Sequence, residues 1–404
     1  MNGRQFSWEA FFSYGFRPFF LFACVFAALS MSAWMLWIGL HAASAQVLRP
    51  TIAMAPHAWH AHEMLFGYTM AVIAGFFLTA VPNWTGAKPV NGGALVLLSA
   101  AWLAGRAAVW MSAHLPMALV AAVDLAFIPI LLAMVAKALL RRWAPRNFVF
   151  IPILTLLLVA NALVHAEWLE WLDGGTEIAY GLALNTVVVL IAIVGGRVVP
   201  AFTTNALRRM GHDRLPASHK PLEIAAIVSV VAVLIAELAG WDGMIAGTIG
   251  GLAALAHAFR LAGWQGHKTL TEPIVWVLHL GYGWLVVGLG LKAAAHFGLL
   301  GHASAIHALT VGAVGTMTLA IMTRASLGHT GRALKVNGTT AVAYVMISLS
   351  AALRIAVPVL IPEVYNEGMI VAGLLWVAAF AAVSVAYWPV LTMPRISSRA
   401  ATDD

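Results

Sequence analysis

Three histidines lie within six residues, in a stretch that also carries a carboxylate and a thioether. His57, His60 and His62 are followed directly by Glu63 and Met64. Imidazole nitrogen, carboxylate oxygen and thioether sulfur are side-chain ligands of transition metals, so this spacing predicts a metal or haem site. On a helix, His60 and Met64 share one face, whereas His60 and His62 point about 200° apart and serve different partners.

A further histidine, His307, opens a later apolar stretch in the same way. If both stretches enter a membrane from the same side, His60 or His62 can lie at the same depth as His307. A flat macrocycle with two axial imidazoles, or a small-ion site, then fits between them. Small residues follow His307, and they suit either a porphyrin or the close packing of a neighbouring helix. They are Gly312, Ala313, Gly315 and Ala320.

A second group of polar residues falls near the opposite ends of the apolar stretches. Its histidines, His257, His279 and His329, are candidates for a second metal, because ionisable residues at membrane depth are costly unless paired or functional. The arginines at this end could hold haem propionates or another anion with their planar forks. They are Arg17, Arg197, Arg260 and Arg324. The alternative is that such side chains extend to lipid headgroups, which we expect for Arg260.

The elements that must position these residues are membrane-spanning helices. Of the 404 residues, 62% are hydrophobic and only 10% are charged, where soluble domains carry about a quarter. At about 20 apolar residues per span, the chain has room for roughly twelve helices and no sizeable soluble domain. We therefore predict an all-α polytopic bundle in a single integral membrane domain, residues 1–404. The predicted spans are 16–40, 61–83, 94–112, 115–138, 147–165, 177–196, 221–239, 243–263, 273–296, 303–323, 339–361 and 367–390.

The charges of the loops alternate along the chain. Loops after odd-numbered spans are acidic or neutral, and their acidic residues are Glu167, Glu170, Asp173, Asp242, Glu363 and Glu367. Segments after even-numbered spans are basic, with Lys88, Arg141, Arg142, Arg146, Arg208, Arg209, Arg214, Lys220, Lys268, Arg332, Lys335, Arg395 and Arg399. Because positive loops stay in the cytoplasm, the number of spans should be even and both termini cytoplasmic.

Several classes of protein are disfavoured. The net charge is +7, but the basic residues are scattered, so we expect no nucleic-acid partner. Cys24 is the only cysteine, which excludes cysteine-rich metal sites and leaves histidine as the main ligand. No phosphate-binding loop, dinucleotide fingerprint or nucleophile elbow is present. Residues 1–10 lack a secretory pattern, so the first apolar stretch is expected to remain as a span. The two halves show no six-span self-similarity, which disfavours a repeat-built transporter.

Arg106 and Asp124 lie inside the predicted third and fourth spans, and we expect them to form a structural ion pair.

Eight further histidines show no pattern that indicates a partner, and no role is predicted for them. They are His41, His114, His165, His212, His219, His267, His296 and His302.

Five motifs, in order along the chain, resemble the NnrS family. They are Tyr14-Gly15-Phe16-Arg17-Pro18-Phe19-Phe20, residues 59–67, Pro82-Asn83-Trp84-Thr85-Gly86, Gly195-Gly196-Arg197 with Pro200, and residues 307–332. The resemblance implies a twelve-span protein of the bacterial inner membrane that contains iron as haem, of b type, and copper. It further implies a role against nitric oxide and nitrosative stress, as in denitrification, with nitric oxide or a nitrosyl species as the partner.

A weaker similarity is to haem-copper oxidases and nitric oxide reductases. Those proteins also have twelve spans, and their haem-ligating histidines lie toward the periplasmic ends of spans two and ten, as do His60, His62 and His307 here. The histidines that hold copper or non-haem iron in those proteins are missing from spans six and seven. A second metal would then fall to His257, His279 and His329.

Two main functional hypotheses follow. In the first, haem and copper bind or convert nitric oxide at an intramembrane, histidine-ligated site, whether or not the protein is an enzyme. The electron donor of such a reaction is not identified by any motif. In the second, the same residues form a transport pathway for a metal, haem or a nitrosyl-iron complex. A third hypothesis is an assembly partner of a respiratory complex.

Overall fold

The computed structural model describes residues 6–43, 51–141 and 145–396. Of the basic residues that predict the topology, Arg142 and Arg399 lie outside the described residues. The described chain is helical throughout and contains twelve segments long and apolar enough to cross a membrane. This confirms the predicted all-α bundle and its even number of spans. The side of the membrane on which each terminus lies stays a prediction.

Most spans are one helix, and four are built from two or three helical segments. In chain order they are α2 (Phe16–Ala42); α3 (Pro56–His62), η1 (Glu63–Thr69) and α4 (Met70–Thr85); α5 (Gly92–Trp110); α6 (Met117–Leu125) and α7 (Phe127–Arg141); α8 (Pro145–Phe148) and α9 (Phe150–Trp168); α10 (Gly175–Arg209); α11 (Lys220–Leu238); α12 (Gly243–Gly263); α13 (Pro273–His296); α14 (His302–His307), η4 (Ala308–Gly315) and α15 (Thr316–His329); α16 (Gly338–Leu360); and α17 (Tyr365–Thr392). Short helical turns make up the rest: α1 (Trp8–Phe11), η2 (Ser112–His114), η3 (Gly266–Thr269) and η5 (Pro362–Val364).

The ends of the second and tenth spans differ from the predicted ones. The second span begins at Pro56, because proline suits the first turn of a helix, where its missing N–H is not needed. All three histidines of the first cluster are therefore helical. The tenth span continues to His329, which was predicted to lie just beyond it.

Two of the spans contain a segment of π-helix. In η1 and η4 the wider turn directly follows His62 and His307, respectively. Segments of this kind are rare and are found frequently at functional sites. Both histidines singled out by sequence therefore stand at the start of an irregular backbone segment.

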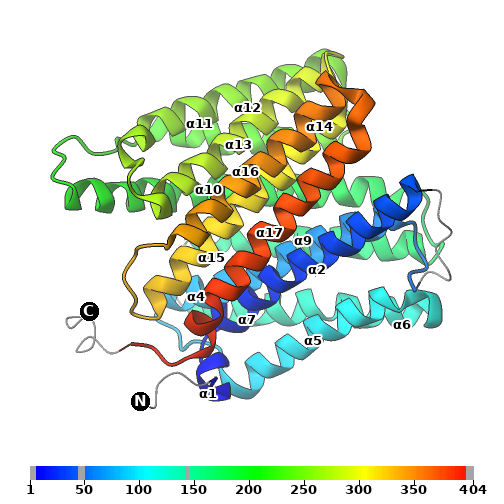
Figure 1. The fold of residues 1–404 in the computed structure, drawn as a ribbon, viewed down its shortest axis with the longest axis horizontal. Coiled ribbons are helices and arrows are strands. Elements are labelled where there is room, and N and C mark those ends of the chain that lie inside the picture. Colours follow the sequence, from blue (N-terminus) through cyan, green and yellow to red (C-terminus); the bar gives the residue numbers. More distant parts are fainter. Residues whose placement is uncertain (1–5, 44–50, 142–144, 397–404) are drawn as a thin grey trace. The chain divides into compact units, whose positions relative to one another are not determined.

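The described chain falls into two compact parts, each of which is described by itself. The first part contains residues 1–183, 322–333 and 380–404, and the second contains residues 184–321 and 334–379. In the first part α2 packs against α3, η1 and α4, and α6 packs against α5 and α9. In the second part α11, α12 and α13 pack side by side, and α13 and α16 both contact η4 (Figure 1). That residues 1–404 form one domain stays a prediction.

Three spans are enclosed by protein far more than the others. In the most apolar windows of the second, sixth and tenth spans, 83%, 78% and 72% of residues are buried, against at most 56% elsewhere. The other spans expose large apolar side chains, such as Leu29 and Val385, as expected of helices that face lipid. The second span, which carries the histidine cluster, is thus an interior helix.

Candidate metal centre

His62 is the last residue of α3, and its side chain is completely buried. Its Nδ1 lies 2.9 Å from Glu63 Oε1. Its Nε2 lies 3.0 Å from Asn161 Oδ1 and 3.3 Å from Asp124 Oδ2. His62 therefore joins the start of the second span to residues of the fourth and fifth spans.

Asp124, in α6, is the residue on which the cluster converges. Its Oδ2 lies 2.8 Å from His165 Nε2 and accepts a hydrogen bond of 2.9 Å from Asn161 Nδ2. Its Oδ1 pairs with the guanidinium of Arg106. Asn161 and His165 are four residues apart, so they lie on the same face of α9. The carboxylate is 2% exposed, and a buried charge is stable only with such partners.

Arg106, in α5, bridges the two carboxylates of the cluster. Its Nη1 donates to Glu63 Oε1 at 2.5 Å, and its Nη2 donates to Asp124. The predicted pair of Arg106 and Asp124 is confirmed. Glu63 as the second partner was not predicted.

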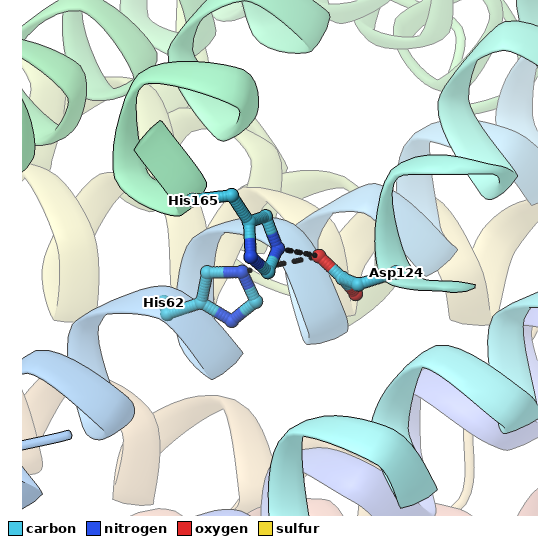
Figure 2. Close-up of side chains that lie close together, drawn as sticks. All are labelled: His62, Asp124 and His165. Atoms are coloured by element: carbon cyan, nitrogen blue, oxygen red, sulfur yellow. Dashed lines mark hydrogen bonds and ion pairs between the residues drawn. The ribbon is translucent and has the colours of Figure 1, made fainter. Parts of the chain in front are cut away.

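Figure 2 shows how the imidazoles of His62 and His165 and the carboxylate of Asp124 point toward one another. Each offers one ligand atom, and these three atoms lie within 4.8 Å of one another. The Nδ1 atom of His165 is buried and has no hydrogen-bond partner among the described residues. Two imidazoles and a carboxylate are a donor set that suits copper, zinc or iron.

The formal charges of the cluster do not cancel. Glu63 and Asp124 contribute two negative charges and Arg106 contributes one positive charge, and all three side chains are at most 9% exposed. One further positive charge is needed at membrane depth, because an uncompensated buried charge is strongly destabilising. A proton on one imidazole or a bound cation can supply it.

Gly105 permits the close approach of α5 to α6. A Cβ atom at this position would lie 2.9 Å from Asp124 Oδ1 and 3.2 Å from its Cα. Because the backbone of Asp124 cannot move away freely, we expect Gly105→Ala to destabilise the protein by about 1–3 kcal/mol and to lower its metal content. Gly93 in the same helix has nothing within 4 Å of such an atom, so Gly93→Ala is the matched control. Thermal unfolding of the two purified variants tests this, and equal melting temperatures would contradict it.

The remaining histidines predicted as ligands lie elsewhere. His60 stacks on the ring of Trp34 at 4.7 Å, so it and His62 do meet different partners. His307 lies in the second part, where its Nδ1 donates to the carbonyl of Ala303 at 2.7 Å. The pairing of His307 with His60 or His62 across the two parts stays a prediction.

The histidines of the second group do not converge within either part. Both nitrogens of His257 are engaged, with the hydroxyl of Tyr282 at 2.6 Å and the carbonyl of Ala226 at 2.9 Å. His279 Nε2 lies 2.8 Å from the hydroxyl of Thr203. His329 belongs to the first part, where its ring stacks on that of Tyr14 at 6.0 Å. Whether these residues bind a metal stays a prediction.

Arg17 and Arg260 have partners within the protein. Arg17 donates to the carbonyls of Leu391 and Met393 at 3.0 and 2.6 Å, at the carboxyl end of α17. Arg260 is 4% exposed and pairs with Glu223. The expectation that Arg260 reaches lipid headgroups is therefore wrong, because a carboxylate one helix away holds its charge inside the protein.

Arg197 is exposed at its place in α10, and Arg324 is half-buried in α15. Their predicted role in holding haem propionates stays a prediction.

Three members of the cluster were not recognised as site residues in the sequence. The sequence predicts Asp124 only as part of the ion pair, and it predicts no role for His165 or Asn161. The available signal was the spacing of Asn161 and His165 on one helix face, together with two carboxylates at membrane depth. The sequence alone does not show which spans pack against one another.

The fold and the site together define the class of this protein. It is a twelve-span α-helical membrane protein with a buried cluster of histidines and carboxylates. Within that class, a family model described as NnrS protein matches residues 10–395. The chain belongs to the NnrS family, as its motifs predict. No curated protein matches the chain.

Proposed function

We propose that this protein acts in the response to nitric oxide, with a copper ion held by His62, Asp124 and His165 in the inner membrane of a bacterium. Family membership and the helical membrane fold support the role in that response. The observation that carries the copper site is the convergence of three buried donor atoms within 4.8 Å.

The residues of the cluster fit copper in chemistry and in charge. Imidazole and carboxylate are suitable ligands, and the single cysteine of the chain excludes a cysteine-rich site. A bound copper ion can supply the missing positive charge, which a proton on one imidazole would otherwise provide. Copper bound here would supply one-electron chemistry and a position at which nitric oxide can bind.

The other residues of the cluster orient the ligands and exclude water. Asn161 contacts both His62 and Asp124, and Glu63 accepts from His62 Nδ1 or from Arg106. Partners of this kind fix the orientation of ligating side chains. Trp168 covers the site, with its ring 4.9 Å from that of His62 and 5.1 Å from that of His165.

His62 does not fit an axial position of haem as well as it fits a small ion. Its side chain is 0% exposed and the ring of Trp168 lies 4.9 Å from that of His62, whereas a porphyrin needs open space on the ligating side of an imidazole. We therefore propose copper at this cluster and haem at another position in the chain.

A site of this kind suits nitric oxide as a partner. The gas is small and uncharged and partitions into lipid, so it needs no polar channel to reach the bilayer interior. The same metal could bind nitric oxide without reaction, convert a nitrosyl species, or take part in a reductase-like reaction. The reductase-like reaction also needs an electron donor.

Two measurements test the proposal. One is the metal content of the full-length protein purified in detergent, and the other is the removal of nitric oxide by proteoliposomes that contain the protein. We expect about one copper per chain and loss of nitric oxide from the solution, both reduced at least tenfold in His165→Gln. His114→Gln, at an exposed histidine of the same part, is the matched control.

Two results would contradict the proposal. One is a copper-free protein that still removes nitric oxide. The other is net movement of a metal, haem or nitrosyl-iron complex across the proteoliposome membrane without loss of nitric oxide, which would establish the transport hypothesis instead.

A further inference from the structure

Three arginines gather at one end of the first part, where α2 begins and where α15 and α17 end. This basic cluster consists of Arg17, Arg332 and Arg395. The segments that follow α15 and α17 are joined by a hydrogen bond of 3.1 Å from the amide of Ile396 to the carbonyl of Thr330. Gly331, with a φ of +74°, makes the turn between them possible, because a Cβ atom there would lie 2.7 Å from the carbonyl oxygen of Ile396 and 3.4 Å from Arg395 Nε.

No acidic residue balances the basic cluster within the described part of the chain. None of the ion pairs of the described residues includes one of these arginines. Arg17 lies near enough to Arg332 for their charges to repel each other. The carboxyl ends of α15 and α17 each offset about half of one charge. Three guanidinium groups therefore leave an excess of positive charge.

Capping of α17 explains Arg17 but not the other two arginines. Arg332 Nη2 lies 3.5 Å from the carbonyl oxygen of Pro389, whereas its Nη1 is buried without a hydrogen-bond partner among the described residues. A donor of this kind is costly unless a ligand satisfies it. Burial lowers the pKa of Arg332, and an anion close by would raise it again. Arg332 is half-buried and Arg395 is exposed, so both side chains can turn toward a ligand outside the protein.

Large aromatic side chains lie on the surface beside the basic cluster. Phe6, Trp8 and Trp388 are 40%, 68% and 49% exposed. The ring of Phe6 lies 4.7 Å from that of Trp8 and 6.3 Å from that of Trp388, so α1 lies beside the end of α17 (Figure 1). Trp388 comes one residue before the carbonyl that Arg332 contacts. Exposed tryptophans are typical of the depth at which lipid headgroups meet the hydrocarbon.

We propose that the basic cluster binds the phosphate group of an anionic phospholipid, with Arg332 and Arg395 as the donors. A free phosphate ion offers the same oxygens to a guanidinium fork, but the aromatic surface favours the lipid, whose acyl chains would pack against Trp388. Basic pockets between spans bind lipid headgroups in this way. Arg17 is 4% exposed and held by two carbonyls, so it contributes charge without touching the ligand. This site does not depend on the proposed function.

Native mass spectrometry of the full-length protein in detergent, with dioleoyl phosphatidylglycerol added, tests the proposal. We expect one lipid per chain to resist dissociation, and the double variant Arg332→Gln, Arg395→Gln to bind it about thirtyfold more weakly. Lys88→Gln with Arg141→Gln is the matched control, because it removes the same charge from two exposed residues of the same part. Phosphatidylglycerol should also raise the melting temperature of the wild type and the control, but not that of the double variant.

Three results would overturn the proposal. Equal affinity of the double variant and the wild type would show that the arginines do not hold the lipid. Equal retention of phosphatidylcholine, which has no net charge, would show that the site does not select an anion. Displacement of the lipid by an excess of inorganic phosphate would identify a free phosphate ion as the ligand. If the double variant does not fold, Arg395→Gln alone, at an exposed residue, should still weaken lipid binding about fivefold.

Discussion

Replacement of Asp124 by asparagine is expected to abolish copper binding and leave the fold intact. The amide has the same size but no charge, so it is a much poorer ligand for a metal ion. It also leaves Arg106 paired with Glu63 alone, which balances the buried charge without a further cation. Metal analysis should show the copper content falling from about one per chain to less than a tenth of that. Thermal unfolding should show a change of only a few degrees.

The haem content of Asp124→Asn gives an internal control, because haem is proposed at another position in the chain. Retention of stoichiometric copper in this variant would contradict the assignment of Asp124 as a ligand. Loss of copper and haem together, with a large drop in melting temperature, would show that the substitution disturbs the fold instead.

The largest loss of stability is expected from Arg106→Met. This change leaves the carboxylates of Glu63 and Asp124 buried without their shared cation, and breaking a buried ion pair in this way costs about 3–5 kcal/mol. The methionine keeps much of the volume, so packing against Phe26 is largely preserved. Expression level and the melting temperature of the detergent-solubilised protein are the measurements.

A triple variant distinguishes the effect of charge from the effect of packing in this result. If the excess of negative charge is the cause, Glu63→Gln and Asp124→Asn should together restore most of the stability that Arg106→Met removes, because no buried charge then remains. If the triple variant is as unstable as Arg106→Met alone, the guanidinium acts through its packing and hydrogen bonds, and the electrostatic explanation fails.

The fold was largely predictable from the sequence because a bilayer imposes a simple rule on span length and loop charge. The ends of the second span differ from the predicted range of 61–83, although Pro56 and Gly86 mark them in the sequence. The pair of Arg106 and Asp124 was predictable too, because two opposite charges at membrane depth need each other. These inferences use local composition and require no knowledge of which helices touch.

The composition of the site was less predictable because it depends on which spans are neighbours. His165 is marked in the sequence only by its four-residue spacing from Asn161, and its role becomes visible only when α9 packs against α6.

The central claim is that copper is held by the imidazoles of His62 and His165 and the carboxylate of Asp124. X-ray absorption at the copper edge of the purified protein tests it most directly. We expect two nitrogen scatterers with the outer-shell pattern of imidazole, and one oxygen, at about 2.0 Å. In His165→Gln the copper should be lost, so the copper-edge signal should fall at least tenfold. Copper without imidazole scattering, or with a signal unchanged in His165→Gln, would contradict the account.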